Sequence, residues 1–178
     1  MKDYIYFYYD EIKRFSPVLL LIYTLYYVKE EIYKRFLFFG YIINIILNFI
    51  LKNYVFSPLM KDNYYPIIGY GMRPENAKNC DLWSTGKIAT SYGMPSGHAQ
   101  IITFFLISQL FKSNGLSLSR STTILSYNNL LWIFITLMLL YSRIELGCHT
   151  YQQVVIGIVF GILSYFITQK IVKITTPK

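Results

Sequence analysis

Apolar runs recur along this chain, and they constrain its fold more than any other feature. A helix that crosses a bilayer needs ~20 mostly apolar residues. We expect five such helices, at residues 15–28, 36–56, 98–111, 124–141 and 154–171. Charged residues make up only 15% of the 178, against roughly 25% in a soluble domain, so too few remain to cover a water-facing surface. The predicted fold is an all-α, multi-pass transmembrane helix bundle, formed by a single domain over residues 1–178.

Two segments lie outside these runs. The first, MKDYIYFYYDEIKRF, is too acidic and aromatic for the apolar region of a signal peptide, and we expect it to form a helix at the membrane interface. The second is the polar stretch 57–95, which contains four of the six prolines and shows no strong helical or strand period. Connections of this length are usually functional or disordered.

The net charge of +8 favours anionic lipid headgroups over nucleic acid as a partner, because the basic residues cluster at the ends of the predicted spans. The two cysteines, Cys80 and Cys148, lack the spacing of metal ligands, and we interpret them as free thiols. Both fall on one side of the membrane when the spans alternate, so a disulfide is the alternative if that side is oxidising.

Alternating spans also bring the unusual polar groups to one face of the membrane. That face carries both histidines of the chain, His98 and His149, together with Arg73 and Arg143. An arginine at membrane depth is costly unless it is paired or bound to an anion, and few acidic residues are close to these positions in the predicted topology. We infer that an anion completes this site.

A phosphate fits these groups. Guanidinium groups bind phosphate oxygens through paired hydrogen bonds, and the amides of Gly97 and His98 would open a helix whose dipole favours an anion. Ser96 adds a hydroxyl, although a serine at this place ordinarily caps the helix. Of the two imidazoles, one could attack phosphorus while the other protonates the leaving oxygen.

The motifs RP, PSGH and SR-x5-H, in this order, resemble the three signatures of the type-2 phosphatidic acid phosphatase superfamily, which also includes bacterial acid phosphatases and vanadium haloperoxidases. The resemblance covers residues 52–153. It implies that His149 is the nucleophile that forms a phosphohistidine and that His98 protonates the departing oxygen. It implies no metal ion and no cofactor, because cationic groups do the electrostatic work. The groups implied to hold the phosphoryl oxygens are Arg73, Arg143, Ser96 and the amide of Gly97.

The third motif departs from the family pattern at one position. Where the family commonly has Asp, this chain has Gln153, as the dolichyl diphosphatase branch does. Its amide oxygen can accept the N–H of His149 and orient the ring. Glu145, four residues before the histidine, is the rival partner if that segment is helical.

The first motif lacks its lysine. At the place where the family has it, seven residues before Arg73, stands Pro66. Lys52 directly follows the second predicted span, whereas Lys61 lies in a loop beside an aspartate. We expect Lys52 rather than Lys61 to bind the phosphate, and the alternative is that Lys52 anchors the span at the interface.

The predicted function is that of a membrane lipid phosphatase that hydrolyses a polyisoprenyl (dolichyl-type) diphosphate to the monophosphate. Two alternatives stay open: a phosphatidate or lysophospholipid phosphatase, and a catalytically inactive membrane protein that binds lipid phosphates. The expected partners are a lipid phosphate or diphosphate and the membrane, with no nucleic acid. Lys and Arg outside the site are more numerous on the opposite face, so the site is predicted to face the lumen or the exterior, at the endoplasmic reticulum membrane in a eukaryote.

Overall fold

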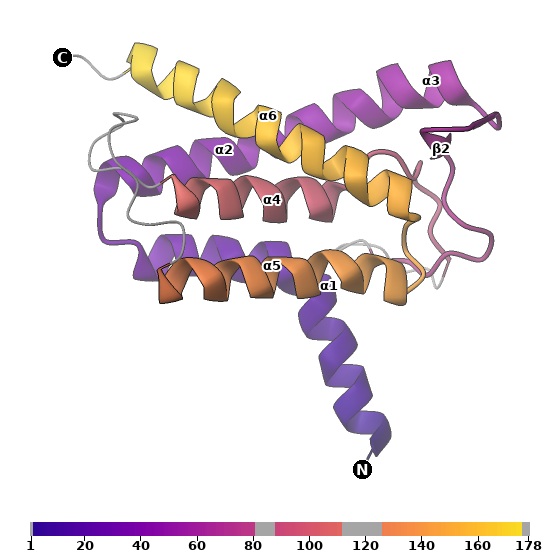
Figure 1. Ribbon diagram of the computed structural model, residues 1–178, viewed down its shortest axis with the longest axis horizontal. Helices are drawn as coiled ribbons and strands as arrows, with labels where there is room; N and C mark the ends of the chain where they lie inside the picture. The colour runs from indigo at the N-terminus through magenta and orange to yellow at the C-terminus, as the bar shows by residue number, and fades with distance from the viewer. Residues whose placement is uncertain (1, 81–87, 112–125, 176–178) are drawn as a thin grey trace.

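The structure, a computed structural model, describes residues 2–80, 88–111 and 126–175. In these ranges the chain forms helices and one small two-stranded hairpin (Figure 1). The prediction of an all-α bundle is confirmed. The elements are α1 (Lys2–Tyr27), α2 (Glu31–Ile50), the π-helical turn η1 (Leu51–Phe56), α3 (Ser57–Met60), β1 (Tyr64–Tyr65), β2 (Gly69–Tyr70), α4 (Gly97–Leu110), α5 (Tyr127–Glu145) and α6 (Tyr151–Thr175).

The N-terminal segment is helical as expected, and its place at the membrane interface stays a prediction. α1 is one helix that contains both the N-terminal segment and the first predicted span. Pro17 lies inside it, and Figure 1 shows the N-terminal part of α1 projecting at an angle from the bundle. A proline removes one helical hydrogen bond and bends a helix, so a single helix can both leave the bundle and pack within it.

The second predicted span is longer than expected. The helix of α2 continues through η1 into α3, so that a helical segment runs from Glu31 to Met60. In the described part of the chain, this segment and Tyr151–Lys173 in α6 are the two helices that are long and apolar enough to cross a membrane. The spans placed in α1, α4 and α5 stay predictions.

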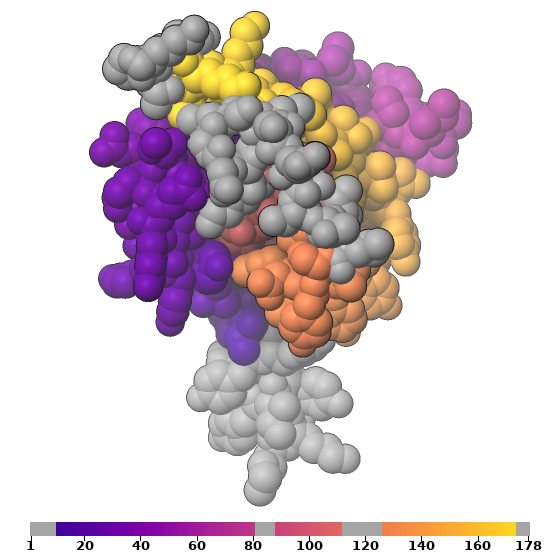
Figure 2. Space-filling view, turned by 60° about the vertical axis from the view of Figure 1, so that its left-hand side comes forward, coloured from indigo at the N-terminus to yellow at the C-terminus, as the bar shows by residue number. Residues whose placement is uncertain are grey.

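α4 is the central helix of the bundle. It contacts α1, α2, α5 and α6, and a patch of it is visible beside α5 in Figure 2. α6 approaches it closely at two glycines: a Cβ on Gly157 would lie 2.6 Å from the Ser96 carbonyl oxygen, and one on Gly161 would lie 2.5 Å from the Gln100 carbonyl oxygen. Small residues that let two backbones approach are typical of membrane helix pairs, and here they hold the start of α4 against α6.

The two ends of the bundle differ in character. One end gathers α3, the starts of α4 and α6, and the end of α5 (Figure 1). Away from it the core is aromatic, with Phe36 packed on Phe104 and Tyr165 at centroid distances of 5.9 and 5.6 Å. Large apolar side chains also face outward, among them Phe49 (58% exposed) and Phe134 (61%), as expected for helices that contact lipid.

The long connection before α4 is tied to the bundle in its described part. The amides of Gly93 and Met94 donate to the Gly71 carbonyl at 3.1 and 3.0 Å, which joins the first-motif loop to the PSGH stretch. Cys80 forms a disulfide with Cys148 across a Cα–Cα distance of 6.0 Å. The interpretation of the cysteines as free thiols is therefore wrong, and the alternative of a disulfide is the one observed.

Candidate active site

The PSGH stretch opens α4 at the polar end of the bundle. Ser96 is the N-cap, and its Oγ accepts from the Ala99 amide at 3.4 Å. Gly97 and His98 are the first two residues of the helix, so the amides of the first turn lie at this end. The cap uses the serine oxygen as an acceptor, which leaves its hydroxyl hydrogen available to donate.

His149 lies in the turn between α5 and α6 and is 4% exposed. Gly147 has a φ of +67°, a conformation that glycine adopts readily, and the amides of Cys148 and His149 both donate to the Arg143 carbonyl, at 3.0 and 3.2 Å. The Nδ1 of His149 lies 3.0 Å from Gln153 Oε1. An amide oxygen only accepts, so Nδ1 carries the hydrogen and Nε2 keeps its lone pair.

Gln153 joins His149 to the first-motif loop. Its Nε2 donates to the carbonyls of Tyr70 and Met72 at 3.1 and 2.5 Å, which sets the direction of the amide. The side chain is fully buried. Glu145 is not the partner of His149, because it forms an ion pair with a lysine of α1 instead.

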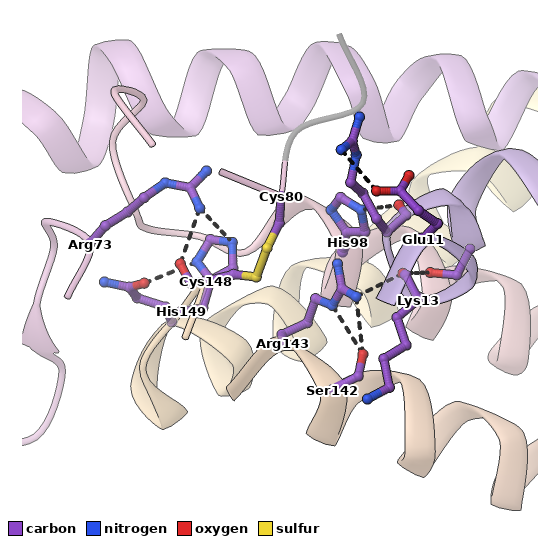
Figure 3. The surroundings of a disulfide bond; sticks show 12 residues. Glu11, Lys13, Arg73, Cys80, His98, Ser142, Arg143, Cys148 and His149 are labelled. Atoms are coloured by element: carbon purple, nitrogen blue, oxygen red, sulfur yellow. Dashed lines mark hydrogen bonds and ion pairs between the residues drawn. A yellow bond between two sulfur atoms is a disulfide. The ribbon is translucent and has the colours of Figure 1, made fainter. Parts of the chain in front are cut away.

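Arg73 lies beside the unprotonated nitrogen of His149 (Figure 3). Its Nη1 is 3.5 Å from His149 Nε2 and donates to the Cys148 carbonyl at 3.0 Å. Ser91 holds the rest of the guanidinium, since Arg73 Nε donates to its carbonyl at 3.0 Å and Nη2 to its Oγ at 2.8 Å. A fixed positive charge at this place suits a reaction in which negative charge develops next to this nitrogen.

The surroundings of His149 keep its imidazole neutral. Burial lowers the pKa of His149 well below its ordinary value of 6.5, and the charges of Arg73, Lys52 and, more weakly, His98 lower this pKa further. The hydrogen bond to Gln153 raises the pKa by less than these effects lower it. At physiological pH the Nε2 lone pair is therefore available for attack.

Arg143 lies in the last turn of α5 and is fully buried. Its Nε and Nη2 donate to Ser142 Oγ at 3.2 and 3.1 Å, and Nη2 also donates to the Lys13 carbonyl at 2.7 Å. Nη1 is buried without a hydrogen-bond partner among the described residues. A buried charged donor of this kind is costly, and an anion would satisfy it.

The second histidine is bound by α1. Nε2 of His98 lies 2.9 Å from the main-chain carbonyl oxygen of Arg14, and because a carbonyl only accepts, the hydrogen of this imidazole is on Nε2. Sequence reasoning did not predict any contact between α1 and the site. Pro17 marks a bend inside this apolar run, but a bend alone does not specify a contact.

A groove of about 830 Å³ opens at the start of α4. Its polar lining includes Lys52, Gly97 and His98. Lys52 lies in the π-helical turn η1, a rare conformation that is frequent at functional sites, whereas Lys61 is exposed beyond α3. The apolar lining comes from α1, α2 and α4 and includes Pro17, Ile45, Phe49 and Ile101.

The assembled side chains are mainly cationic. Arg73, Lys52 and His98 all act on the charge of His149, and Arg143 binds the α1 carbonyl next to the one that His98 contacts. Within residues 2–80, 88–111 and 126–175, no group of three His, Cys, Asp or Glu side chains converges as metal ligands do. The donors present match the oxygens of a phosphoryl group.

Comparison with protein families identifies the family to which this cluster belongs. The profile of the PAP2 superfamily matches residues 33–176, which include every site residue predicted from the sequence motifs. The chain belongs to the PAP2 superfamily. The family resemblance given by the three motifs is thereby confirmed, and the PAP2 region begins within α2 and ends with α6.

The PAP2 chain also has a curated relative. Dolichyldiphosphatase 1 of Rhinolophus ferrumequinum is 27% identical over 159 residues, which cover 83% of this chain and 57% of the relative. The chain thus spans little more than half the length of that protein. No solved structure matches this chain.

Proposed function

We propose that this chain is a metal-independent membrane phosphatase that hydrolyses a polyisoprenyl diphosphate of the dolichyl type to the monophosphate. One observation carries the proposal: His149, bound by Gln153 through Nδ1, has an unprotonated Nε2 beside the Arg73 guanidinium. A neutral imidazole nitrogen next to a fixed positive charge is suited to attack phosphorus. The PAP2 family and the dolichyldiphosphatase relative support a lipid phosphatase.

In the first step, Nε2 of His149 uses its lone pair to form a bond to the terminal phosphorus. The bond between this phosphorus and the bridging oxygen breaks, and the bridging oxygen keeps the electron pair. His98 donates its Nε2 proton to that oxygen, which leaves as the lipid monophosphate. Arg73, Arg143 and Lys52 offset the negative charge of the transferred phosphoryl group.

In the second step, water attacks the phosphohistidine. His98, which has lost its Nε2 proton, accepts a proton from the water as the water oxygen bonds to phosphorus. The bond between nitrogen and phosphorus breaks, its electron pair returns to Nε2 of His149, and inorganic phosphate leaves. Gln153 keeps the other hydrogen on Nδ1 throughout, because its oxygen accepts from that nitrogen.

The groove supports a lipid as the substrate. Its lining combines Lys52 and His98 with apolar side chains of three helices, and a phosphate on a long hydrocarbon chain has the same combination of charge and apolar surface. The name of the relative, dolichyldiphosphatase, favours a polyisoprenyl diphosphate over phosphatidate.

We further propose that the site faces the lumen or the exterior, at the endoplasmic reticulum membrane if the organism is a eukaryote. The distribution of Lys and Arg supports this orientation, and so does the disulfide between Cys80 and Cys148 at the same end of the bundle, since disulfides persist in oxidising compartments. In sealed microsomes, a reductant that does not cross membranes should leave this disulfide intact, and its reduction there would place the site on the cytoplasmic side.

Phosphate release by the purified protein in detergent tests the function. A polyisoprenyl diphosphate, phosphatidate and lysophosphatidate are compared at equal concentration, with His149→Ala as the matched inactive control. We expect the diphosphate to be hydrolysed fastest, in the presence of EDTA as in its absence, and vanadate to inhibit because its five-coordinate form resembles the transition state.

Each of the other outcomes would support a different function for this protein. Faster release from phosphatidate would make phosphatidate, and not the polyisoprenyl diphosphate, the preferred substrate. No release from any lipid would indicate a protein that binds lipid phosphates without turnover. Loss of activity in EDTA, restored by magnesium, would refute the metal-independent mechanism.

A further inference from the structure

Pro17 changes the hydrogen bonding of α1 next to the site. In an α-helix each N–H binds the carbonyl four residues earlier, and proline has no N–H to give. The carbonyl oxygen left without a helical hydrogen bond is that of Lys13. This oxygen accepts instead from Arg143 Nη2 at 2.7 Å and from Ser16 Oγ at 2.9 Å.

The next carbonyl oxygen of α1, that of Arg14, accepts a hydrogen bond from His98. The Arg14 oxygen lies 2.9 Å from His98 Nε2. Because the two carbonyls are successive in one helical turn, they hold Arg143 and His98 close to each other, as Figure 3 shows.

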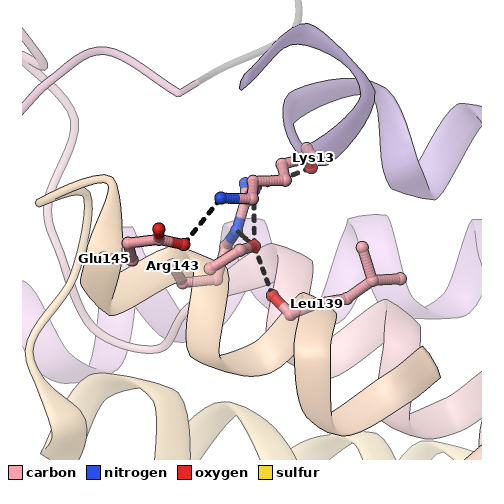
Figure 4. A network of polar contacts seen from close by, with 5 residues as sticks. Lys13, Leu139, Arg143 and Glu145 are labelled. Carbon is pink, nitrogen blue, oxygen red and sulfur yellow. Dashed lines mark hydrogen bonds and ion pairs between the residues drawn. The ribbon is translucent and has the colours of Figure 1, made fainter. Parts of the chain in front are cut away.

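The side chain of Lys13 fastens α1 to the same part of α5 (Figure 4). It is buried, and its Nζ lies 2.6 Å from Glu145 Oε2. Glu145 follows Arg143 by two residues, so the main chain and the side chain of Lys13 both bind the last turn of α5. An ion pair with a buried partner is screened less by salt than an exposed one.

These contacts set the direction of the Arg143 guanidinium. Ser142 and Lys13 bind its Nε and Nη2, and Nη1 is the nitrogen that has no hydrogen-bond partner in the described part of the chain. In Figure 3 the nitrogen without a dashed line is on the side of His98. A phosphoryl oxygen bound there would lie near the proton on His98 Nε2.

We propose that Pro17 and Lys13 are positioning residues of the phosphate site. Through the Lys13 carbonyl they hold Arg143 with Nη1 directed at the phosphoryl group, and the neighbouring carbonyl of Arg14 keeps the proton of His98 on Nε2. This inference rests on the proposed function, because it assigns the contacts to phosphoryl binding. It makes α1, which precedes all three sequence motifs, a part of the site.

Pro17→Ala tests the proposal. Alanine restores an N–H that competes with Arg143 for the Lys13 carbonyl, and it favours the helix, so we expect the variant to fold. In a thermal-shift titration with orthovanadate, the Kd should rise about tenfold, as for the loss of one hydrogen bond to a charged group. KM for the lipid diphosphate should rise more than kcat falls.

Two further variants serve as controls. Leu19→Ala changes an outward-facing side chain of the same helix, 45% exposed, and should bind vanadate as the wild type does. Lys13→Met removes the ion pair but keeps the carbonyl, so its Kd should rise less than that of Pro17→Ala.

Equal vanadate affinity in Pro17→Ala, Leu19→Ala and the wild type would overturn the inference, and so would a lower melting temperature of Pro17→Ala with no change in Kd. A wild-type protein that binds vanadate but releases no phosphate from any lipid would instead refute the proposed function. The Kd values of the variants would then still decide the role of Pro17.

Discussion

The two histidines of the site carry their hydrogens on opposite ring nitrogens, and the difference comes from their partners. His149 presents Nδ1 to the amide oxygen of Gln153, while His98 presents Nε2 to the carbonyl of Arg14. Both partners only accept, so each fixes one tautomer. One imidazole is left with a lone pair on Nε2 and the other with a proton there, as a nucleophile and an acid require.

Their surroundings separate them further. His149 is 4% exposed, in a turn held by a disulfide, whereas His98 is half-buried and lines the groove. Residue type alone therefore does not assign a role in this site. The hydrogen-bond acceptor beside each ring and the burial of the ring do so.

Removal of the proposed nucleophile, His149, tests the difference between the two imidazoles most directly. We expect His149→Ala to reduce phosphate release by about 10,000-fold or more, as removal of a covalent catalyst does, with both the lipid diphosphate and an activated phosphate ester. Trapping of labelled phosphate on the wild-type protein, and not on the variant, would identify the intermediate. Substantial turnover by the variant would show that water attacks directly.

His98→Ala should have a smaller effect that depends on the leaving group. Loss of an acid costs about 100- to 10,000-fold with a leaving oxygen that needs a proton, and far less with a nitrophenolate that does not. Rates with the lipid diphosphate and with a nitrophenyl phosphate give the ratio. If both substrates lose activity equally, His98 does not act as the acid.

Lys52→Gln tests whether Lys52 is one of the phosphate-binding charges. We expect turnover to fall by ~100-fold, within the range for losing one electrostatic stabiliser, because Lys52 lines the groove with Gly97 and His98. Lys61→Gln is the matched control, since this lysine is exposed beyond α3. This variant should leave turnover nearly unchanged. Equal small effects would leave Lys52 as a membrane anchor.

The parts of the site that depend on rare side chains could be predicted from the sequence. Histidines and arginines are costly in an apolar chain, which marks His98, His149 and Arg143 in the sequence. Alternating helices predict that these residues lie together, and the structure brings them to one end of the bundle. The start of α4 was predictable for a similar reason, because Ser96 is a common N-cap residue before an apolar run.

The contribution of α1 could not be predicted in this way. Its contacts with the site use main-chain carbonyls of Lys13 and Arg14, and every residue has such a carbonyl, so no side-chain pattern marks them. The disulfide was undecided for another reason: two cysteines 68 residues apart have no spacing that specifies a pair. The π-helical turn at Lys52 likewise has no sequence signature among the motifs.

Gln153→Glu tests the electrostatic side of the comparison. In the wild type the pKa of His149 is well below 6.5, so activity should persist below pH 6.5 until the imidazole is protonated. A carboxylate beside Nδ1 stabilises the imidazolium and raises this pKa, so the acidic limb of kcat/KM should move to higher pH. The loss of the Nε2 donor to the carbonyls of Tyr70 and Met72 should cost roughly tenfold in rate at the optimum.

The control for this charge is Gln152→Glu, which adds a carboxylate one residue away on the same helix. Its pH profile should stay close to that of the wild type. An unchanged acidic limb in Gln153→Glu would mean that His149 does not act in its neutral form.

Removal of the disulfide should have a small effect on rate, and this effect should come from His149 and not from His98. Cys148 precedes His149, and its carbonyl accepts from Arg73, so Cys80→Ala together with Cys148→Ala should loosen the nucleophile and its arginine and lower kcat by roughly threefold to tenfold. Stability should fall by about 4 kcal/mol, the chain-entropy value for a loop of this length.

The ratio of rates with the lipid diphosphate and with the nitrophenyl ester should stay the same, because His98 is held by α1 and not by the disulfide. A change in that ratio would mean that the two imidazoles are coupled and that their tautomers are not fixed independently.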